Sequence, residues 1–167
     1  MIIRRAEDSD APRVLAMLSQ VLEIHAKLRP DIFIPGSTKY TAEELREIFH
    51  NEATPVYVAA DGADEAVGYL FCVLREPPFA NTMRPRKSFF IDDFCVDERC
   101  RGGGIGRALF AFALEEARRL GCDEVTLNVW EGNDAARRFY EKLGMRPKET
   151  QMEYPLPSTP TSSPVPR

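Results

Sequence analysis

A glycine-rich segment between an apolar strand and an amphipathic helix constrains the fold of this chain more than any other feature. Residues 101–106 read Arg-Gly-Gly-Gly-Ile-Gly, after an apolar run at 88–96 and before apolar residues at helical spacing from 105 to 120. Glycines carry no Cβ, so backbone N–H groups can converge there on an anion at the helix N-terminus. Arg101 and Arg107 add positive charge at the same point. The pattern predicts a strand–loop–helix unit that can hold a diphosphate.

Three interpretations of this segment are open on its residues alone. A dinucleotide-binding turn requires G-x-G-x-x-G, but Leu109 stands where the third glycine would be. A nucleotide P-loop requires a Gly-Lys dipeptide, and the sequence contains none. The third interpretation is a glycine-rich turn without a ligand.

Hydrophobic periodicity predicts further helices and strands around this unit, which indicates an α/β fold. Helices are expected at residues 10–28, 41–51, 105–120 and 133–144, and strands at 2–3, 56–60, 66–74, 88–96 and 125–130. Residues 155–167 contain five prolines and five serines or threonines. A segment of that composition cannot bury enough surface to offset its ordering entropy, so a disordered C-terminal tail is expected there.

Length and composition favour one globular domain and exclude several classes of protein. The chain has 167 residues, 44% hydrophobic and 29% charged, with a net charge of −4. An acidic chain lacks the positive field that drives nucleic-acid binding, and no apolar run approaches the roughly 20 residues of a membrane span. The charges at residues 4–8 argue against a signal peptide, and isolated cysteines fit reduced thiols, so a cytoplasmic protein is expected. With two histidines and no C-x-x-C pair, no metal site is expected.

Two blocks of residues identify a resemblance to a known superfamily. Residues 101–106 match the Q/R-x-x-G-x-G/A signature of GNAT-type N-acetyltransferases, and Val96 stands five residues ahead of Arg101 as in that superfamily. Residues 133–145 resemble its second conserved block, in the right order and at the right separation. The resemblance covers residues 1–154 and implies a single domain there, an α/β GNAT fold. That fold has a central, mixed, mostly antiparallel sheet of six to seven strands flanked by about four helices.

The resemblance also implies a site for acetyl-CoA as cosubstrate. The main chain of the strand before the glycine loop would pair with the pantetheine arm, and the loop amides would hold the pyrophosphate. Asn133 matches a cofactor-contacting position, although a plain helix N-cap explains it too. The residues expected to bind acetyl-CoA are Phe94, Cys95, Val96, Arg101, Gly102, Gly103, Gly104, Ile105, Gly106, Arg107, Asn133, Ala136 and Tyr140.

Tyr140 matches the tyrosine that, in this superfamily, often protonates the leaving thiolate of CoA. A phenol within hydrogen-bond reach can supply that proton. Phe139 and Tyr140 could instead be an aromatic pair that packs into the core.

The acceptor amine must lose a proton before it attacks, because its pKa lies near 10. Asp92 and Asp93 lie in an otherwise apolar strand, and strand alternation predicts that they point to opposite faces. The stretch at 92–96 is similar to that of polyamine acetyltransferases, which implies Asp92 as the base. The alternative is that each aspartate meets solvent or an arginine.

The N-terminal helices and their connecting loop often line the acceptor pocket in this superfamily. The residues so implicated are His25, Arg29, Phe33 and Trp130, with Asp31, Tyr40 and Glu131 nearby. Arg29 could equally anchor its loop through an ion pair with Asp31. The function implied is direct acetyl transfer to a primary amine of a small molecule, without an acetyl-enzyme. A protein or peptide acetyltransferase and a non-catalytic acyl-CoA sensor stay open, and a homodimer is common among relatives.

Overall fold

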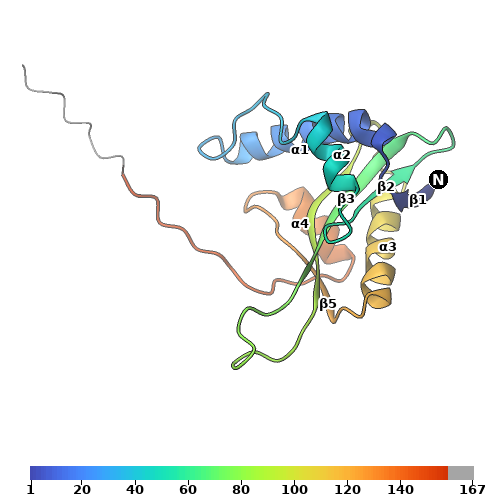
Figure 1. Cartoon of the computed structure of the whole chain (residues 1–167). Coiled ribbons are helices and arrows are strands. Elements are labelled where there is room, and N and C mark those ends of the chain that lie inside the picture. Colours follow the sequence, from blue (N-terminus) through green and yellow to red (C-terminus); the bar gives the residue numbers. More distant parts are fainter. Residues whose placement is uncertain (158–167) are drawn as a thin grey trace, which may run out of the picture.

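The computed structural model describes residues 1–157 and has one five-stranded sheet with helices on both faces (Figure 1). The strands lie in the order β1-β2-β3-β4-β5. Their bounds are β1 Ile2–Arg5, β2 Val56–Ala60, β3 Ala66–Arg75, β4 Ser88–Val96 and β5 Glu124–Leu127. The helices are α1 Ala11–Leu28, α2 Ala42–Phe49, α3 Ile105–Arg119 and α4 Asp134–Lys142.

Local sequence signals account for several helix ends. Thr41 caps α2 in a capping box, because its hydroxyl accepts the Glu44 amide at 3.2 Å and Glu44 accepts the Thr41 amide at 2.7 Å. Pro12 lies in the first turn of α1, where its missing N–H costs no hydrogen bond. Gly121 follows α3 with a left-handed φ of 69°. No helix within residues 1–157 is long and apolar enough to cross a membrane.

The sheet is mixed, as the sequence predicts. Strands β1 to β4 pair antiparallel, and β4 pairs parallel with β5 from Ser88–Glu124 to Ile91–Leu127. A parallel neighbour requires a crossover, and α3 supplies it between β4 and β5. The glycine loop therefore lies at the end of β4, where the chain leaves the sheet to enter α3.

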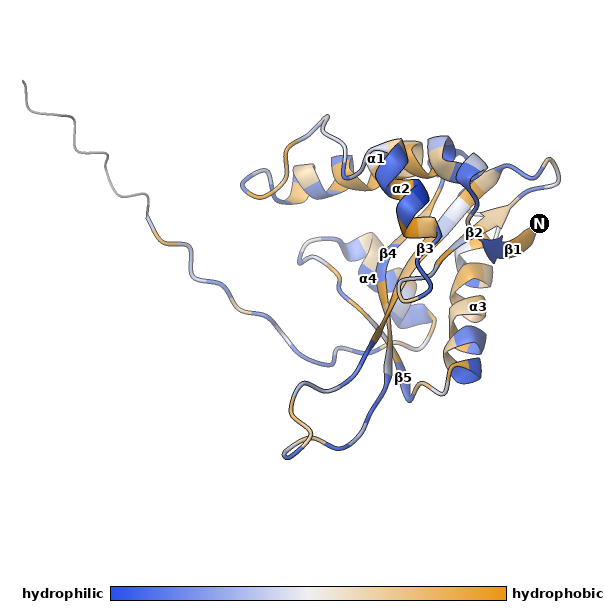
Figure 2. Ribbon diagram, in the orientation of Figure 1, coloured by the Kyte–Doolittle hydropathy of each residue, from blue (hydrophilic) through white to orange (hydrophobic). Residues whose placement is uncertain are grey.

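Two apolar clusters cover the two faces of the sheet. One joins α1 and α2 to side chains of β2 and β3, and the other joins α3 to the opposite face (Figure 2). The second cluster depends on a close approach at Gly68, where an added Cβ would lie 2.9 Å from Leu109 Cδ1 and 3.0 Å from the Cys95 carbonyl oxygen. Because glycine permits that approach, α3 packs directly over the end of β4.

The strand count is the main difference from the expected architecture. The sequence predicts six to seven strands, but the described residues form five. Strand β5 ends at Leu127, before the predicted limit at residue 130, and residues 145–157 form no strand. Pro147 and Pro155 cannot donate to a ladder, which weakens strand pairing along this segment. Residues 155–157 are exposed without secondary structure, and the rest of the predicted disordered tail, 158–167, lies outside the described residues.

Candidate active site

Strands β4 and β5 separate about halfway along β4. Their pairing ends at Ile91 and Leu127, although β4 continues to Val96. Within residues 1–157, the second half of β4 pairs with β3 alone. Its outer edge can therefore hydrogen-bond an extended molecule, which is the geometry that the sequence resemblance implies for Phe94, Cys95 and Val96.

The glycine loop presents a row of free backbone donors beside this gap. Gly102 and Gly104 have left-handed φ angles of 84° and 82°, and Gly104 is the N-cap of α3. Across the described part of the chain, the amides of residues 101–107 donate no hydrogen bond. An added Cβ at either glycine would meet no heavy atom within 4 Å, so the space in front of the loop is open. This arrangement fits a diphosphate at a helix N-terminus.

Replacing Gly104 with alanine should weaken acetyl-CoA binding about tenfold, because a Cβ disfavours the left-handed backbone by about 1–2 kcal/mol. Gly121→Ala is the matched control, since Gly121 also has a positive φ, of 69°, and open space around it, but lies at the other end of α3. Titration calorimetry measures the affinity of each variant for acetyl-CoA. Equal affinities for the two variants would contradict a role of the loop conformation in binding.

Arg101 and the cap of α4 complete the surroundings of the loop. The Arg101 Nε donates to the Val96 carbonyl oxygen at 3.1 Å, which ties the loop to the end of β4. Asn133 caps α4, because its Oδ1 accepts the Ala136 amide at 3.3 Å. The N-cap interpretation of Asn133 is therefore confirmed, and its contact with the cofactor stays a prediction.

Tyr140 lies on α4 in an aromatic pocket that faces the end of β4. Its ring centroid is 5.9 Å from that of Phe94, 5.1 Å from Phe139 and 6.4 Å from Phe110. Burial raises the pKa of the phenol, and the negative charge of Asp93 raises it further, so the hydroxyl keeps its proton at neutral pH. Among the described residues no group hydrogen-bonds this hydroxyl, which leaves its proton available to a substrate. The ring packs against Phe94, Phe110 and Phe139, as the alternative interpretation expects, and its catalytic role stays a prediction.

A β-bulge changes the directions in which the side chains of Asp92 and Asp93 point from β4. Phe71 pairs with Asp93 and the next residue of β3, Cys72, pairs with Ile91, so Asp92 is an extra residue without a partner in register. Lys39 Nζ reaches both carboxylates, at 3.1 Å from Asp93 and 3.7 Å from Asp92. The prediction that Asp92 and Asp93 point to opposite faces is therefore wrong, because the extra residue of the bulge interrupts the alternation of side chains along β4.

Asp93 is the more enclosed of the two carboxylates. It is 11% exposed, against 43% for Asp92, and it accepts a hydrogen bond from the fully buried Tyr69 hydroxyl at 3.0 Å. Its charge also acts on His25 and Tyr140, which lie on opposite sides of β4. Asp93 thus lies beside Asp92 against the same lysine, an arrangement that strand alternation did not predict because of the bulge.

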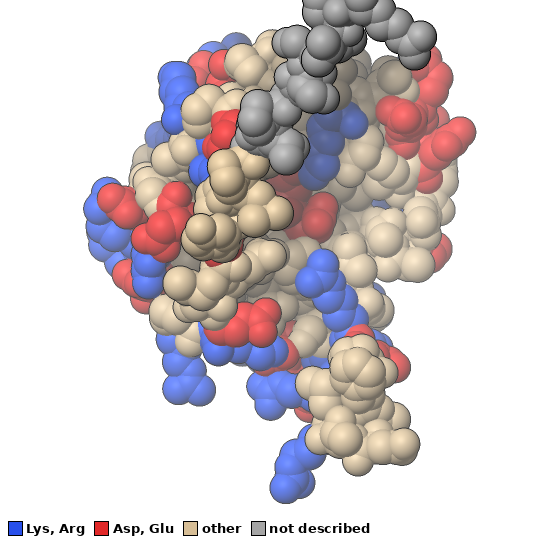
Figure 3. Space-filling model, turned by 90° about the vertical axis from the view of Figure 1, so that its left-hand side faces the viewer, with Lys and Arg blue, Asp and Glu red and all other residues tan. Residues whose placement is uncertain are grey.

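The four residues predicted to bind the acceptor come together at the C-terminal end of α1. Ring centroids of His25 and Phe33 are 5.1 Å apart, those of Phe33 and Trp130 5.4 Å, and the Arg29 guanidinium lies 5.8 Å from the Trp130 ring. Arg29 also binds Asp31 at 2.6 Å, so the anchoring role considered for it is real. In the face shown in Figure 3, acidic side chains lie in the depth of a hollow.

Burial lowers the pKa of His25, and the negative charge of Asp93 opposes that shift. Tyr40, from the same loop as Phe33, stacks on Phe71 with centroids 6.2 Å apart. The cluster therefore lies beside the bulge of β4, on the sheet face covered by α1 and α2.

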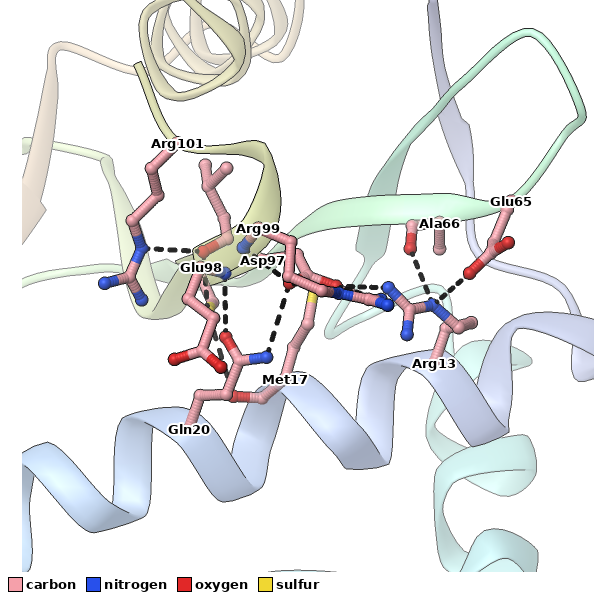
Figure 4. Close-up of polar contacts among 11 residues, drawn as sticks. Arg13, Met17, Gln20, Glu65, Ala66, Asp97, Glu98, Arg99 and Arg101 are labelled. Atoms are coloured by element: carbon pink, nitrogen blue, oxygen red, sulfur yellow. Dashed lines mark hydrogen bonds and ion pairs between the residues drawn. The ribbon is translucent and has the colours of Figure 1, made fainter. Parts of the chain in front are cut away.

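Asp97 is a buried residue of this region that sequence reasoning missed (Figure 4). It follows β4 directly, and its carboxylate accepts hydrogen bonds from Arg13, from Arg99 Nη2 at 2.9 Å and from Gln20 at 3.5 Å. The hydrogen bonds from Arg99 hold its pKa well below the usual range, with Arg13 contributing. An acid between an apolar strand and the glycine loop is the signal that could have found it. The network joins the segment directly before the glycine loop to α1.

Donor groups for a metal ion do not gather within residues 1–157, since no set of three or more His, Cys, Asp or Glu side chains lies close enough together. The four cysteines are free thiols. Burial raises the pKa of Cys95 to about 12, so this thiol is protonated at neutral pH.

The comparison with known proteins decides the family. A sequence profile described as the Acetyltransferase (GNAT) family matches residues 19–145, well over half of the chain. The chain belongs to the GNAT acetyltransferase family.

Similar proteins differ in how much of their length this chain matches. A mutant of the BH1408 protein from Bacillus halodurans is 36% identical with a TM-score of 0.88, over 93% of this chain and 99% of that one. Mycothiol acetyltransferase from Thermobispora bispora is 36% identical over 105 residues, 63% of this chain but 28% of the relative. Peptidyl-lysine N-acetyltransferase YjaB from Escherichia coli is 30% identical over 114 residues, 68% of this chain and 64% of the relative. The chain thus spans less than a third of the mycothiol enzyme's length.

Proposed function

We propose that this protein transfers the acetyl group of acetyl-CoA to a primary amine of a small molecule, by direct attack within a ternary complex. The observation that carries the proposal is the gap between β4 and β5, which opens between the free amides of residues 101–107 and the acids of the bulge. Cofactor and acceptor can then approach β4 from opposite sides. A cytoplasmic location is part of the proposal.

Each side of the gap offers one half of the chemistry. On the α3 and α4 side, Tyr140 keeps its proton and can give it to the departing thiolate of CoA. On the α1 and α2 side, Asp92 and Asp93 can hold an ammonium group and accept its proton, directly or through water. A backbone N–H of the unpaired edge of β4 can polarise the thioester carbonyl. The protonated Cys95 thiol supports direct transfer over an acetyl-cysteine.

Asp92 remains the predicted base, and the structure supports adding Asp93 to the same role. Asp93→Asn should lower kcat for amine acetylation about 100-fold, the lower end of what a general base contributes. Asp92→Asn should also lower activity and shift the acid limb of the pH profile. Steady-state rates measured from pH 6 to 10 distinguish the contribution of Asp92 from that of Asp93. An unchanged profile in either variant removes that residue from the proton transfer.

The test of the function is release of CoA thiol from acetyl-CoA in the presence of polyamines, amino acids, aminoglycosides or short peptides. Release with a small amine would support the proposal. Release with peptides alone would favour a protein acetyltransferase, an activity for which one relative, peptidyl-lysine N-acetyltransferase, is named. Tight acetyl-CoA binding without release for any acceptor would favour an acyl-CoA sensor.

A further inference from the structure

The amine of Lys39 already occupies the position that the proposed acceptor amine would take. Lys39 belongs to the loop between α1 and α2, and its Nζ lies 3.1 Å from Asp93 Oδ2 and 3.7 Å from Asp92 Oδ2. The same ammonium is 5.4 Å from the centroid of the Tyr40 ring, close enough for a cation–π contact. Three groups from two segments of the chain thus hold one primary amine at the bulge.

This amine sits at the point where β4 leaves β5. The last paired residue is Ile91, and the two carboxylates that bind Lys39 are the next two residues of the strand. On the other side of β4, the negative charge of Asp93 contributes to the raised pKa of Tyr140. The ammonium therefore lies beside the strand segment whose free edge would receive the thioester.

We propose that Lys39 is an internal acetyl acceptor, a site at which the protein acetylates itself when acetyl-CoA is bound and no external amine is present. This inference rests on the proposed function, since it uses the same donor and the same acids. It adds a covalent modification site, with an aliphatic lysine amine as the substrate.

The chemical balance is that of acetyl transfer to any amine. Lys39 Nζ gives one proton to the Asp93 carboxylate, its lone pair forms the bond to the acetyl carbon, and the attached nitrogen then loses a second proton to solvent. The C–S bond of the thioester breaks, and the CoA sulfur takes a proton from Tyr140, which regains one from solvent. The products are Nε-acetyl-lysine and CoA, with one net proton released. No oxidant or reductant is needed.

The environment of Lys39 explains why the step would be slow and local. Burial lowers the pKa of the ammonium, but the charge and hydrogen bond of Asp93 outweigh this and raise it overall, so most of the amine is protonated. The same carboxylate that holds the proton is the group that accepts it. Acetylation removes the charge of Lys39, ends both ion pairs and frees Asp92 and Asp93 for an external amine.

The chain supplies a matched internal control. Of its five lysines, Lys148 also pairs with a carboxylate, Glu124 at 2.7 Å, but this pair lies at the beginning of β5, away from the gap. Nonspecific acetylation by the thioester would treat the two amines alike. Acetylation at the site would favour Lys39.

The experiment incubates the full chain with acetyl-CoA alone and follows each lysine by peptide mass spectrometry. Lys39 should be acetylated at least about tenfold faster than Lys148, with a rate independent of protein concentration, and Asp93→Asn should slow Lys39 about 100-fold. Lys39→Arg should leave the remaining lysines at the background rate. Equal rates at Lys39 and Lys148, or a Lys39 rate unaffected by Asp93→Asn, would overturn the inference.

A parallel sample with the external amine panel separates this inference from the function on which it rests. External amine acetylation with Lys39 at background rate overturns the internal acceptor alone. Failure of both reactions overturns the proposed function as well.

Discussion

The Tyr140→Phe variant should acetylate its amine acceptor about 100-fold more slowly than the parent protein, with little change in its affinity for acetyl-CoA. Phenylalanine keeps the ring that packs against Phe94, Phe110 and Phe139, so the pocket should stay intact. The change removes only the proton that the thiolate would receive. Because the pKa of this phenol is raised, the parent enzyme should keep its acid in the protonated form throughout the neutral range.

Steady-state kinetics and acetyl-CoA titration measure the two parts of this expectation. Tyr57→Phe is the matched control, since its buried hydroxyl donates to Glu116 of α3 at 2.7 Å and has no role in the proposed reaction. That variant should lose some stability and keep its kcat. A Tyr140→Phe enzyme with the parent kcat would assign Tyr140 to packing alone.

The Asp97→Ala variant should be less stable than the parent protein by about 2 kcal/mol, because Arg13 and Arg99 lose charged hydrogen bonds to a buried carboxylate, although Arg13 keeps its ion pair with Glu65 at 2.7 Å. Arg13, which is 24% exposed, would lose its pairing with a carboxylate that is fully buried. Arg99 and Gln20 would lose hydrogen bonds at the same time. Since these contacts join the segment directly before the glycine loop to α1, acetyl-CoA binding should weaken as well.

Urea unfolding measures the loss, with Asp8→Ala as the control. Asp8 also accepts from a basic side chain, His50 at 2.9 Å, but both groups are more than half exposed. A surface pair of that kind contributes about 0–1 kcal/mol. Equal effects of the two substitutions would show that the Asp97 network adds nothing to stability.

The pH dependence of stability follows from the direction of the Asp97 shift. Its folded-state pKa is depressed, so the stabilisation is fully present above the unfolded value of about 4 and is lost as pH falls toward the folded pKa. Asp97→Asn removes the titrating group. The difference in unfolding free energy between the parent protein and Asp97→Asn should therefore be largest near neutral pH and should decrease below pH 4.

Features that depend on neighbours in the chain were predictable from sequence. The capping box of α2, the positive φ angles at Gly104 and Gly121, and the alternating strands are consequences of local backbone sterics and spacing. The glycine loop and its place between β4 and α3 were anticipated, whereas the acceptor-binding role of His25, Phe33 and Trp130 stays a prediction. The family match confirms the resemblance on which the cofactor site rests.

Features that depend on distant partners were decided by the tertiary structure. The bulge arises from the pairing of β4 with β3, and it turns Asp92 and Asp93 toward the same lysine. Asp97 pairs with Arg13, which is 84 residues away in the chain. Lys39 pairs with the two aspartates of β4 from the loop between α1 and α2. A sequence fixes which side chains exist and how the local backbone bends, but strand register and buried charge pairing are settled only when remote segments pack.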